Sequence, residues 1–364
     1  MLKRWELVAI VLGGLSLFAP QPEPPARAPQ RLAIYYGYPS LVNEAAGDIE
    51  KAASAFGVFD VIVLGDGVEF ADHRADRQPN GVGAEEHEKA RQIIASIRSH
   101  SPARRVYGYI CLGDSQRLGQ PEIERRADLW KAMGVSGIFL DEAGYDWKIV
   151  DRKRQNAAIA YIHSLGLSAF LNAFYPRDLF SAENLSGKNP DRAASLMDQR
   201  DLFLLESFQV ENGSYEEAGE WQQRVSQALN YRSQFGSSIF ATTTSSLGQP
   251  FDPRKLAYAW WGTWFYGLDG FSWGEPNFAG PDSALPDRGC PSVDAKLINS
   301  QERSRVETDG VLFWRRVGSS LFVIDTANHV VRVAPVETSA QAKLIDFQLV
   351  SLQHSHALTC GASR

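Results

Sequence analysis

The segment GIFLDEAGYD, residues 137–146, has the pattern of a buried strand with an acidic end. Its apolar run, Ile138 to Leu140, is followed at once by two carboxylates, Asp141 and Glu142. Strands of a parallel sheet are buried on both faces and form continuous apolar runs, so this run predicts such a strand. Carboxylates at the end of a buried strand are costly unless they are paired, solvated or used. In α/β barrels that end of the sheet carries the catalytic groups.

Strand and helix signals alternate along the chain on both sides of this stretch. We expect strands over residues 31–39, 58–64, 105–112, 137–140, 167–174, 201–208, 238–244 and 270–273. We expect helices over residues 43–55, 84–99, 122–133, 149–165, 216–234 and 253–266, and a helical piece within 178–200. These eight βα-like steps in about 245 residues predict an α/β fold, the (β/α)8 TIM barrel. A doubly wound sheet is the alternative, but no Gly-rich phosphate fingerprint follows the first strand.

The pattern changes after the eighth strand. Short β-like segments with turns between them follow at residues 311–315, 321–324, 330–333 and 344–350. They predict a small C-terminal β appendage, either packed on the barrel or standing as a separate module. We therefore expect a signal peptide and Pro-rich linker over residues 1–30, the barrel over 31–285 and a β-rich extension over 286–364.

The N-terminal stretch has the pattern of a secretory signal. Basic Lys3 and Arg4 precede an apolar segment, residues 7–19, and a Pro-rich stretch, residues 20–29. The apolar segment is short for a membrane anchor. Cleavage is expected within residues 26–28 or near Ala19. The sequence thus predicts a secreted or periplasmic protein with no stable membrane span once the signal is removed.

The net charge and the number of cysteines limit the binding partners and the disulfides that this chain can have. The net charge of −6 makes nucleic acid an unfavourable partner and suits a neutral or cationic substrate. The three cysteines are too few for a disulfide framework and do not have metal-site spacing. Cys111 is expected to be a buried free thiol, whereas Cys290 and Cys360 could pair or remain free. The oligomeric state stays open.

Polar side chains gather where the expected strands end. Each one alone could be a solvated loop residue, but several on one rim indicate a site. Two carboxylates across a cleft are what the cleavage of a glycosidic bond requires. Strand alternation places Asp141 inside the barrel if Phe139 is inside, and Glu206 inside if Leu204 is inside. Glu142 then points off-axis, unless the strand has already bent into its loop. The residues at these ends are Tyr36, Tyr38, Asp66, Tyr109, Asp141, Glu142, Asn172, Glu206, Trp273 and Glu275.

Other chemistries find less support. The seven histidines show no paired spacing at strand ends, so we predict no metal site and no cofactor. A magnesium-dependent carboxylate site stays open, because carboxylate clusters also suit hard cations.

Three segments carry a family resemblance: LAIYYGYPS at 32–40, VYGY at 106–109 and GIFLDE at 137–142. Over roughly residues 31–275 the chain resembles the spherulin-4-like glycoside hydrolases, which are similar to the endo-α-1,4-polygalactosaminidase barrels. The resemblance implies a (β/α)8 barrel that cleaves α-1,4-linked galactosamine or N-acetylgalactosamine polysaccharide, as found in exopolysaccharides. It implies Asp141 as nucleophile and Glu206 as acid/base, with Glu142 as an alternative for either role.

The remaining rim residues are then expected to bind the polysaccharide substrate. Aromatic rings suit the faces of sugars, and polar groups suit their hydroxyls. The alternative hypothesis is that the protein has the same barrel but no catalytic activity, and is a polysaccharide-binding or matrix protein. The expected substrate-binding residues are Tyr36, Tyr38, Asp66, Tyr109, Asn172, Trp273 and Glu275.

Overall fold

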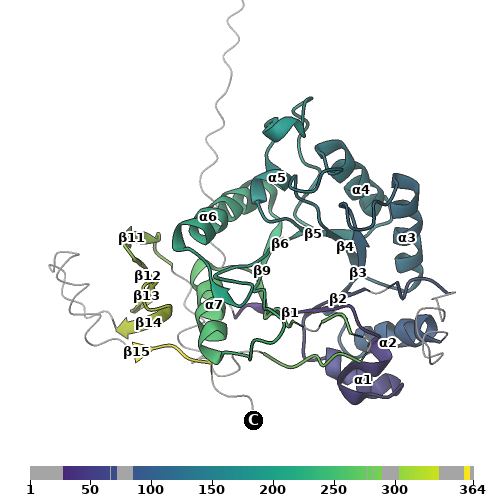
Figure 1. The fold of residues 1–364 in the computed structure, drawn as a ribbon, viewed down its shortest axis with the longest axis horizontal. Coiled ribbons are helices and arrows are strands. Elements are labelled where there is room, and N and C mark those ends of the chain that lie inside the picture. The colour runs from purple at the N-terminus through teal and green to yellow at the C-terminus, as the bar shows by residue number, and fades with distance from the viewer. Residues whose placement is uncertain are drawn as a thin grey trace, which may run out of the picture.

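The computed structural model describes residues 28–65, 67–71, 85–276, 278–280, 282–288, 303–335 and 356–360. Eight parallel strands close into a barrel in the order β1-β10-β9-β6-β5-β4-β3-β2. Figure 1 shows these strands as a ring with the helices outside it. The predicted (β/α)8 TIM barrel is confirmed, as is the small C-terminal sheet. Among the residues described, no helix is both long and apolar enough to cross a membrane.

The barrel strands agree closely with the expected ones. They are β1 Gln30–Tyr35, β2 Val61–Leu64, β3 Arg105–Cys111, β4 Gly137–Asp141, β5 Ser168–Asn172, β6 Leu202–Leu205, β9 Ser238–Thr242 and β10 Gly270–Ser272. The α-helices are α1 Ile49–Phe56, α2 Glu86–His100, α3 Gln120–Ala132, α4 Arg152–Ser164, α5 Pro176–Phe180, α6 Ala218–Phe235 and α7 Pro253–Tyr266. Short 3-10 segments lie at Pro39–Glu44 and Leu185–Gly187, and a small hairpin is formed by β7 Val210–Glu211 and β8 Ser214–Tyr215.

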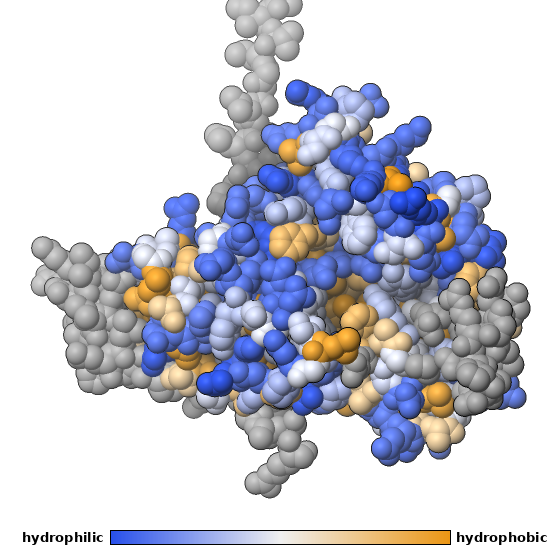
Figure 2. All heavy atoms as spheres, viewed as in Figure 1, coloured by the Kyte–Doolittle hydropathy of each residue, from blue (hydrophilic) through white to orange (hydrophobic). Residues whose placement is uncertain are grey.

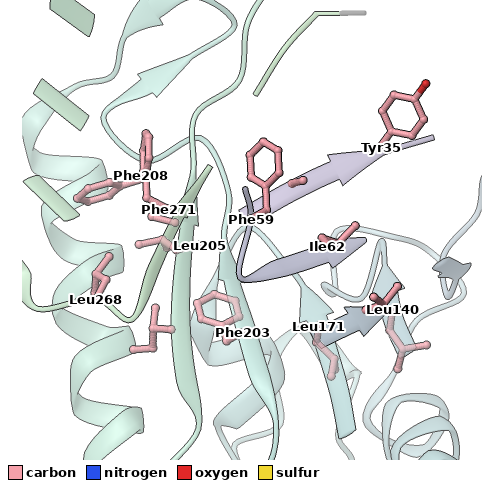
Figure 3. Close-up of a cluster of buried hydrophobic side chains, with 14 of the residues drawn as sticks. Tyr35, Phe59, Ile62, Leu140, Leu171, Phe203, Leu205, Phe208, Leu268 and Phe271 are labelled. Atoms are coloured by element: carbon pink, nitrogen blue, oxygen red, sulfur yellow. The ribbon is translucent and has the colours of Figure 1, made fainter. Parts of the chain in front are cut away.

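Side-chain alternation sorts each strand into an inner and an outer face. Figure 3 shows outer residues of β4, β5 and β6, among them Leu140, Leu171 and Phe203, within the core between strands and helices. The inner residues form a second core inside the barrel. This inner core consists of Leu32, Val61, Val63, Tyr107, Phe139, Phe170, Leu202, Leu204 and Phe240. The premise that Phe139 and Leu204 face inward is therefore confirmed.

Gly108 in β3 lets the strand approach α3 closely. A Cβ atom there would lie 2.1 Å from the ring of Trp130, which donates its indole N–H to the carbonyl of Tyr109 at 3.1 Å. We expect Gly108→Ala to lower the free energy of unfolding by about 1–3 kcal/mol through overpacking, as measured by urea denaturation. Gly219→Ala, where no heavy atom lies within 4 Å of the added Cβ, is the matched control. Equal stability of the two variants would contradict this packing.

The stretch 178–200 differs from the expectation. Its helical piece is only α5, five residues beginning at Pro176, followed by irregular chain and a 3-10 turn. The buried side chain of Asn189 supplies hydrogen bonds in place of a helix. It donates to the carbonyls of Ala182 and Ala193 at 3.1 and 3.0 Å, and accepts from the Ala193 amide at 2.9 Å. Asparagine side chains often compete with helical hydrogen bonding in this way.

The C-terminal sheet packs on the barrel and is not a separate module. Its antiparallel strands are β11 Glu307–Asp309, β12 Leu312–Val317, β13 Ser320–Asp325, β14 Val330–Pro335 and β15 His356–Ala357. Figure 1 shows the sheet beside α7. The rings of Trp264 in α7 and Phe322 in β13 have centroids 4.5 Å apart. Arg315 donates to the carbonyl of Phe265 at 2.9 Å. The strand expected at 344–350 lies outside the described residues, and β11 and β15 were not expected.

The predictions on the cysteines and on the N-terminal segment can be compared with the structure only in part, because some of these residues lie outside the described ones. Cys111 is buried and free, as expected. Cys360 is disulfide-bonded, whereas its proposed partner Cys290 lies outside the described residues. Most of the expected signal and linker, residues 1–27, lies outside them as well.

On the face drawn in Figure 2, hydrophilic residues predominate and apolar ones form small groups.

Candidate active site

A cavity of about 520 Å³ opens where the chain leaves the carboxyl ends of the barrel strands. Its walls come mainly from the segments that follow β4, β5, β6, β9 and β10. Among the described residues that line it, none is Lys, Arg or His. This lining gives the cavity a negative potential, which favours a neutral polyol or a cation over an anion. Its acidic residues are Asp141, Glu142, Asp146, Glu206, Glu211 and Glu275.

One amide group joins the two carboxylates expected to be central. The side-chain nitrogen of Asn172, at the end of β5, donates to Asp141 Oδ1 at 2.9 Å and to Glu206 Oε2 at 3.0 Å. These two carboxylate oxygens therefore lie at most about 6 Å apart, since their separation cannot exceed the two hydrogen-bond lengths together. Neighbouring parallel strands β4, β5 and β6 thus bring Asp141, Asn172 and Glu206 together.

Burial dominates the electrostatics of Asp141. Loss of water raises the pKa of its carboxyl group above the ordinary value. Hydrogen bonds from Asn172, from the Glu142 amide at 2.9 Å and from the Tyr109 hydroxyl oppose this rise, because they stabilise the ionised form. Asp141 is thus a partly buried carboxylate surrounded by three donors.

Glu206 is also partly buried but has fewer donors. Burial raises its pKa, and the nearby charge of Asp141 raises it further. Arg224 of α6 fixes the chain at this point by donating to the backbone carbonyl of Glu206 at 2.7 Å. The guanidinium also forms a buried ion pair with Glu216 at 2.6 Å, so the end of β6 is held by a charged anchor. A carboxyl group with these surroundings tends to keep its proton, as a general acid requires.

Glu142 leaves the axis of β4, consistent with the expected off-axis direction. Its backbone has a positive φ of 55°, which turns the chain out of the strand directly after Asp141. The carboxylate accepts hydrogen bonds from the backbone amide of Ser115 at 3.0 Å and from the Ser115 hydroxyl. Gly113 permits this approach, because a Cβ atom there would lie 2.5 Å from Glu142 Oε2. Glu142 lines the cavity, yet its carboxylate is tied to the β3–α3 loop.

Two of the expected aromatic contacts line the cavity. Tyr36 meets Tyr109 edge-on at 4.8 Å and Phe278 at 5.2 Å between ring centroids. Trp273 packs edge-on against Phe251 at 5.4 Å. Tyr109 itself lies behind this surface and reaches Asp141.

Of the other expected substrate contacts, one lines the cavity, one does not, and one lies outside the described residues. Glu275 lines the cavity and is paired with Arg288 at 2.8 Å. Tyr38 is only 3% exposed and does not line the cavity, because its side chain is buried at the start of a 3-10 segment. The structure thus assigns Tyr38 to packing and corrects the expectation of a sugar contact. Asp66 lies outside the described residues.

Sequence reasoning missed several cavity residues. Glu211 and Asn212 belong to the β7–β8 hairpin, whose turn residues Asn212 and Gly213 have φ values of 48° and 74°. An Asn-Gly pair is the typical signal of such a turn, so this hairpin was open to prediction. Asp146 and Phe278 also line the cavity. Phe278 is held by its carbonyl, which accepts from the Tyr36 amide at 2.8 Å, a long-range contact without a local sequence signal.

One group of possible metal ligands lies at the other end of the barrel. His163, Asp198 and Asp201 present ligand atoms within 4.8 Å of one another. Asp201 precedes β6 and is already bonded to His163 at 2.9 Å and to the Ala169 amide at 2.8 Å. We interpret this group as a hydrogen-bonded cluster that fixes the start of the strand.

The closed ring of eight parallel strands with outer helices defines the class of this protein, a TIM barrel. No family model and no curated protein matches the chain. A mutant tryptophan synthase α-subunit from Pyrococcus furiosus is 14% identical over 71% of this chain and 89% of that chain, with a TM-score of 0.39. A putative dihydrodipicolinate synthetase from Pseudomonas aeruginosa is 12% identical over 68% and 70%, with a TM-score of 0.36. A 2,3-dimethylmalate lyase is 15% identical over 69% and 77%, with a TM-score of 0.36. Such similarity concerns the fold alone.

Proposed function

We propose that this protein is a secreted, endo-acting glycoside hydrolase of the spherulin-4-like type. Its proposed substrate is a polysaccharide of α-1,4-linked galactosamine or N-acetylgalactosamine. The observation that carries the proposal is the pair of partly buried carboxylates, Asp141 and Glu206, bonded to one amide nitrogen of Asn172 inside an open cavity. Two closely spaced carboxyl groups are the machinery of glycosidic bond cleavage.

The spacing supports a retaining mechanism. Carboxyl groups of retaining enzymes lie about 5–5.5 Å apart, and those of inverting enzymes about 6.5–9.5 Å. The bonded oxygens of Asp141 and Glu206 are at most about 6 Å apart, which is closer than the range of inverting enzymes. Asp141 would attack the anomeric carbon while Glu206 gives its proton to the leaving oxygen. In the second step Glu206 would take a proton from a water molecule whose oxygen attacks the anomeric carbon, so that the bond between the sugar and Asp141 breaks.

The surroundings support this division of roles. A nucleophile must be ionised, and Asp141 has three hydrogen-bond donors that stabilise its charge. The acid must hold a proton, and both burial and the charge of Asp141 raise the pKa of Glu206. Pairs of carboxyl groups with unequal environments divide in this way in known glycosidases.

The substrate class is supported by the lining. An acidic cavity without basic side chains among its described residues suits an amino sugar, whose free amine is a cation. Asn172 Oδ1 is buried and finds no donor among the described residues. An N–H or O–H group of a bound sugar would satisfy it. Tyr36 and Trp273 offer ring surfaces in the same cavity.

Product analysis tests the proposal. The purified protein is incubated with α-1,4-linked galactosamine polymers, both N-acetylated and deacetylated, and the products are identified by mass spectrometry. We expect short hexosamine oligomers from the wild type and none from Asp141→Asn. Binding of the polymer without any product would instead favour the non-catalytic polysaccharide-binding protein. If the protein neither binds nor cleaves these polymers, both the proposed sugar class and the proposed enzymatic role are refuted.

A further inference from the structure

We propose that the polysaccharide leaves the catalytic cavity along a groove that ends at the C-terminal sheet. There Tyr215 and His329 would form the wall of a remote sugar-binding subsite. This inference rests on the proposed glycoside hydrolase function and assigns a role to the sheet. Three cavities carry it, because they follow one another along the surface and share walls.

The β7–β8 hairpin lines all three cavities in the order of its sequence. Glu211 and Asn212 lie in the wall of the catalytic cavity. Gly213 lies in a middle cavity of about 100 Å³. Ser214 and Tyr215 line an outer cavity of about 630 Å³. Five consecutive residues therefore trace a path away from the two carboxylates.

Shared side chains join each cavity to the next. Ser245, Trp273 and Glu275 line both the catalytic and the middle cavity. Lys255 of α7 lines both the middle and the outer cavity. Its ammonium group donates to the carbonyl of Gly213 at 2.5 Å, which fixes the tip of the hairpin. The three cavities are therefore adjacent, and a polymer chain that leaves the two carboxylates would meet them in this order.

The outer cavity has the chemistry of a sugar site. The rings of Tyr215 and His329 are stacked, with centroids 3.8 Å apart and planes at 6°. Burial lowers the pKa of His329, which favours the neutral form of its ring. Lys255 supplies the positive charge of this cavity, with its ammonium group 5.6 Å from the centre of the Tyr215 ring. Ser214, Glu217 and Thr326 add hydroxyl and carboxylate groups around this apolar wall. Carbohydrate sites combine aromatic surface with such polar groups.

The sheet presents His329 from a fixed position. His329 lies in the turn between β13 and β14 with a φ of 50°. Those two strands are paired over six residues, and β13 contacts α7 through Phe322. Tyr258 of α7 meets the His329 ring edge-on at 5.7 Å. Both walls of the outer cavity thus stand on packed elements, as a preformed subsite requires.

Ser214→Trp tests the groove by filling its outer cavity. Ser214 is exposed, so the larger side chain disturbs no buried neighbour. The readout is the ratio of kcat/KM for a long galactosamine polymer to kcat/KM for a trisaccharide. We expect this ratio to fall about tenfold, the equivalent of one lost aromatic subsite. Ser226→Trp, the same substitution at an exposed serine of α6 that lines none of the three cavities, is the control.

Each outcome decides the matter. An unchanged ratio in Ser214→Trp, or an equal fall in Ser226→Trp, would overturn the groove. If the wild type cleaves no polymer, the proposed function fails, and affinity electrophoresis in polymer-containing gels then tests the groove alone. Retardation of the wild type that Ser214→Trp weakens and Ser226→Trp leaves intact would support the groove. Absence of retardation would overturn it.

Discussion

Asp141→Asn is expected to lower kcat/KM on the polysaccharide at least about a thousandfold, because an amide cannot attack the anomeric carbon. The substitution keeps the size of the side chain and its place beside Asn172, so the fold should be unaffected. Initial rates of reducing-end release measure the loss, and circular dichroism checks the fold. Asp151→Asn, at the cap of α4, is the matched control, since its side chain serves only the helix end. Full turnover by Asp141→Asn would remove Asp141 from the mechanism.

Azide separates the roles of the two carboxylates. In a variant without the acid/base, Glu206→Ala, azide can attack the glycosyl intermediate on Asp141 and give a product that retains the anomeric configuration. In a variant without the nucleophile, Asp141→Gly, azide attacks the substrate directly and inverts the configuration. Nuclear magnetic resonance of the glycosyl azides distinguishes the two. The opposite pattern would exchange the roles assigned to Asp141 and Glu206.

Asn172→Ala is expected to lower kcat/KM about a hundredfold and to move its pH profile to higher pH. The Asn172 amide donates to both carboxylates and lowers both pKa values. Without it, both pKa values rise. The acid limb, set by ionisation of Asp141, and the basic limb, set by loss of the proton from Glu206, therefore both move upward.

The profile of kcat/KM from about pH 3 to pH 9 measures this shift. Asn230→Ala, at an exposed position of α6, is the control and should keep the wild-type profile. A lower rate with unmoved limbs would mean that Asn172 only holds the substrate and does not set the charge of the pair.

Most of the barrel and the central pair follow from local patterns. The apolar runs of β4 and β6 and their period of two place Asp141 and Glu206 inside the barrel. Asn172 was predicted at the rim as a substrate contact, but its bridge between the carboxylates depends on the neighbouring order of β4, β5 and β6. Such pairing across strands has no signal within a single segment.

The missed features are those set by distant contacts. Tyr38 looks like a rim residue in the sequence, yet a 3-10 segment directly after β1 buries it. The segment that contains Leu285 returns over the barrel because Asn43 exchanges two hydrogen bonds with the Leu285 backbone, at 2.7 and 3.0 Å. These partners are separated by 242 residues. Only the assembled fold brings them together.

The packing of α7 bears on how the chain folds and how its parts can vary. Trp261 and Trp264 lie between the barrel and Phe322 of the sheet, and the apolar core runs through all three layers without interruption. Removing the sheet would therefore expose two tryptophan rings of a barrel helix to water. We therefore expect barrel and sheet to unfold together in a single step. The loops of such a sheet can vary in evolution, whereas loss or replacement of the whole sheet would also remove part of the packing of α7.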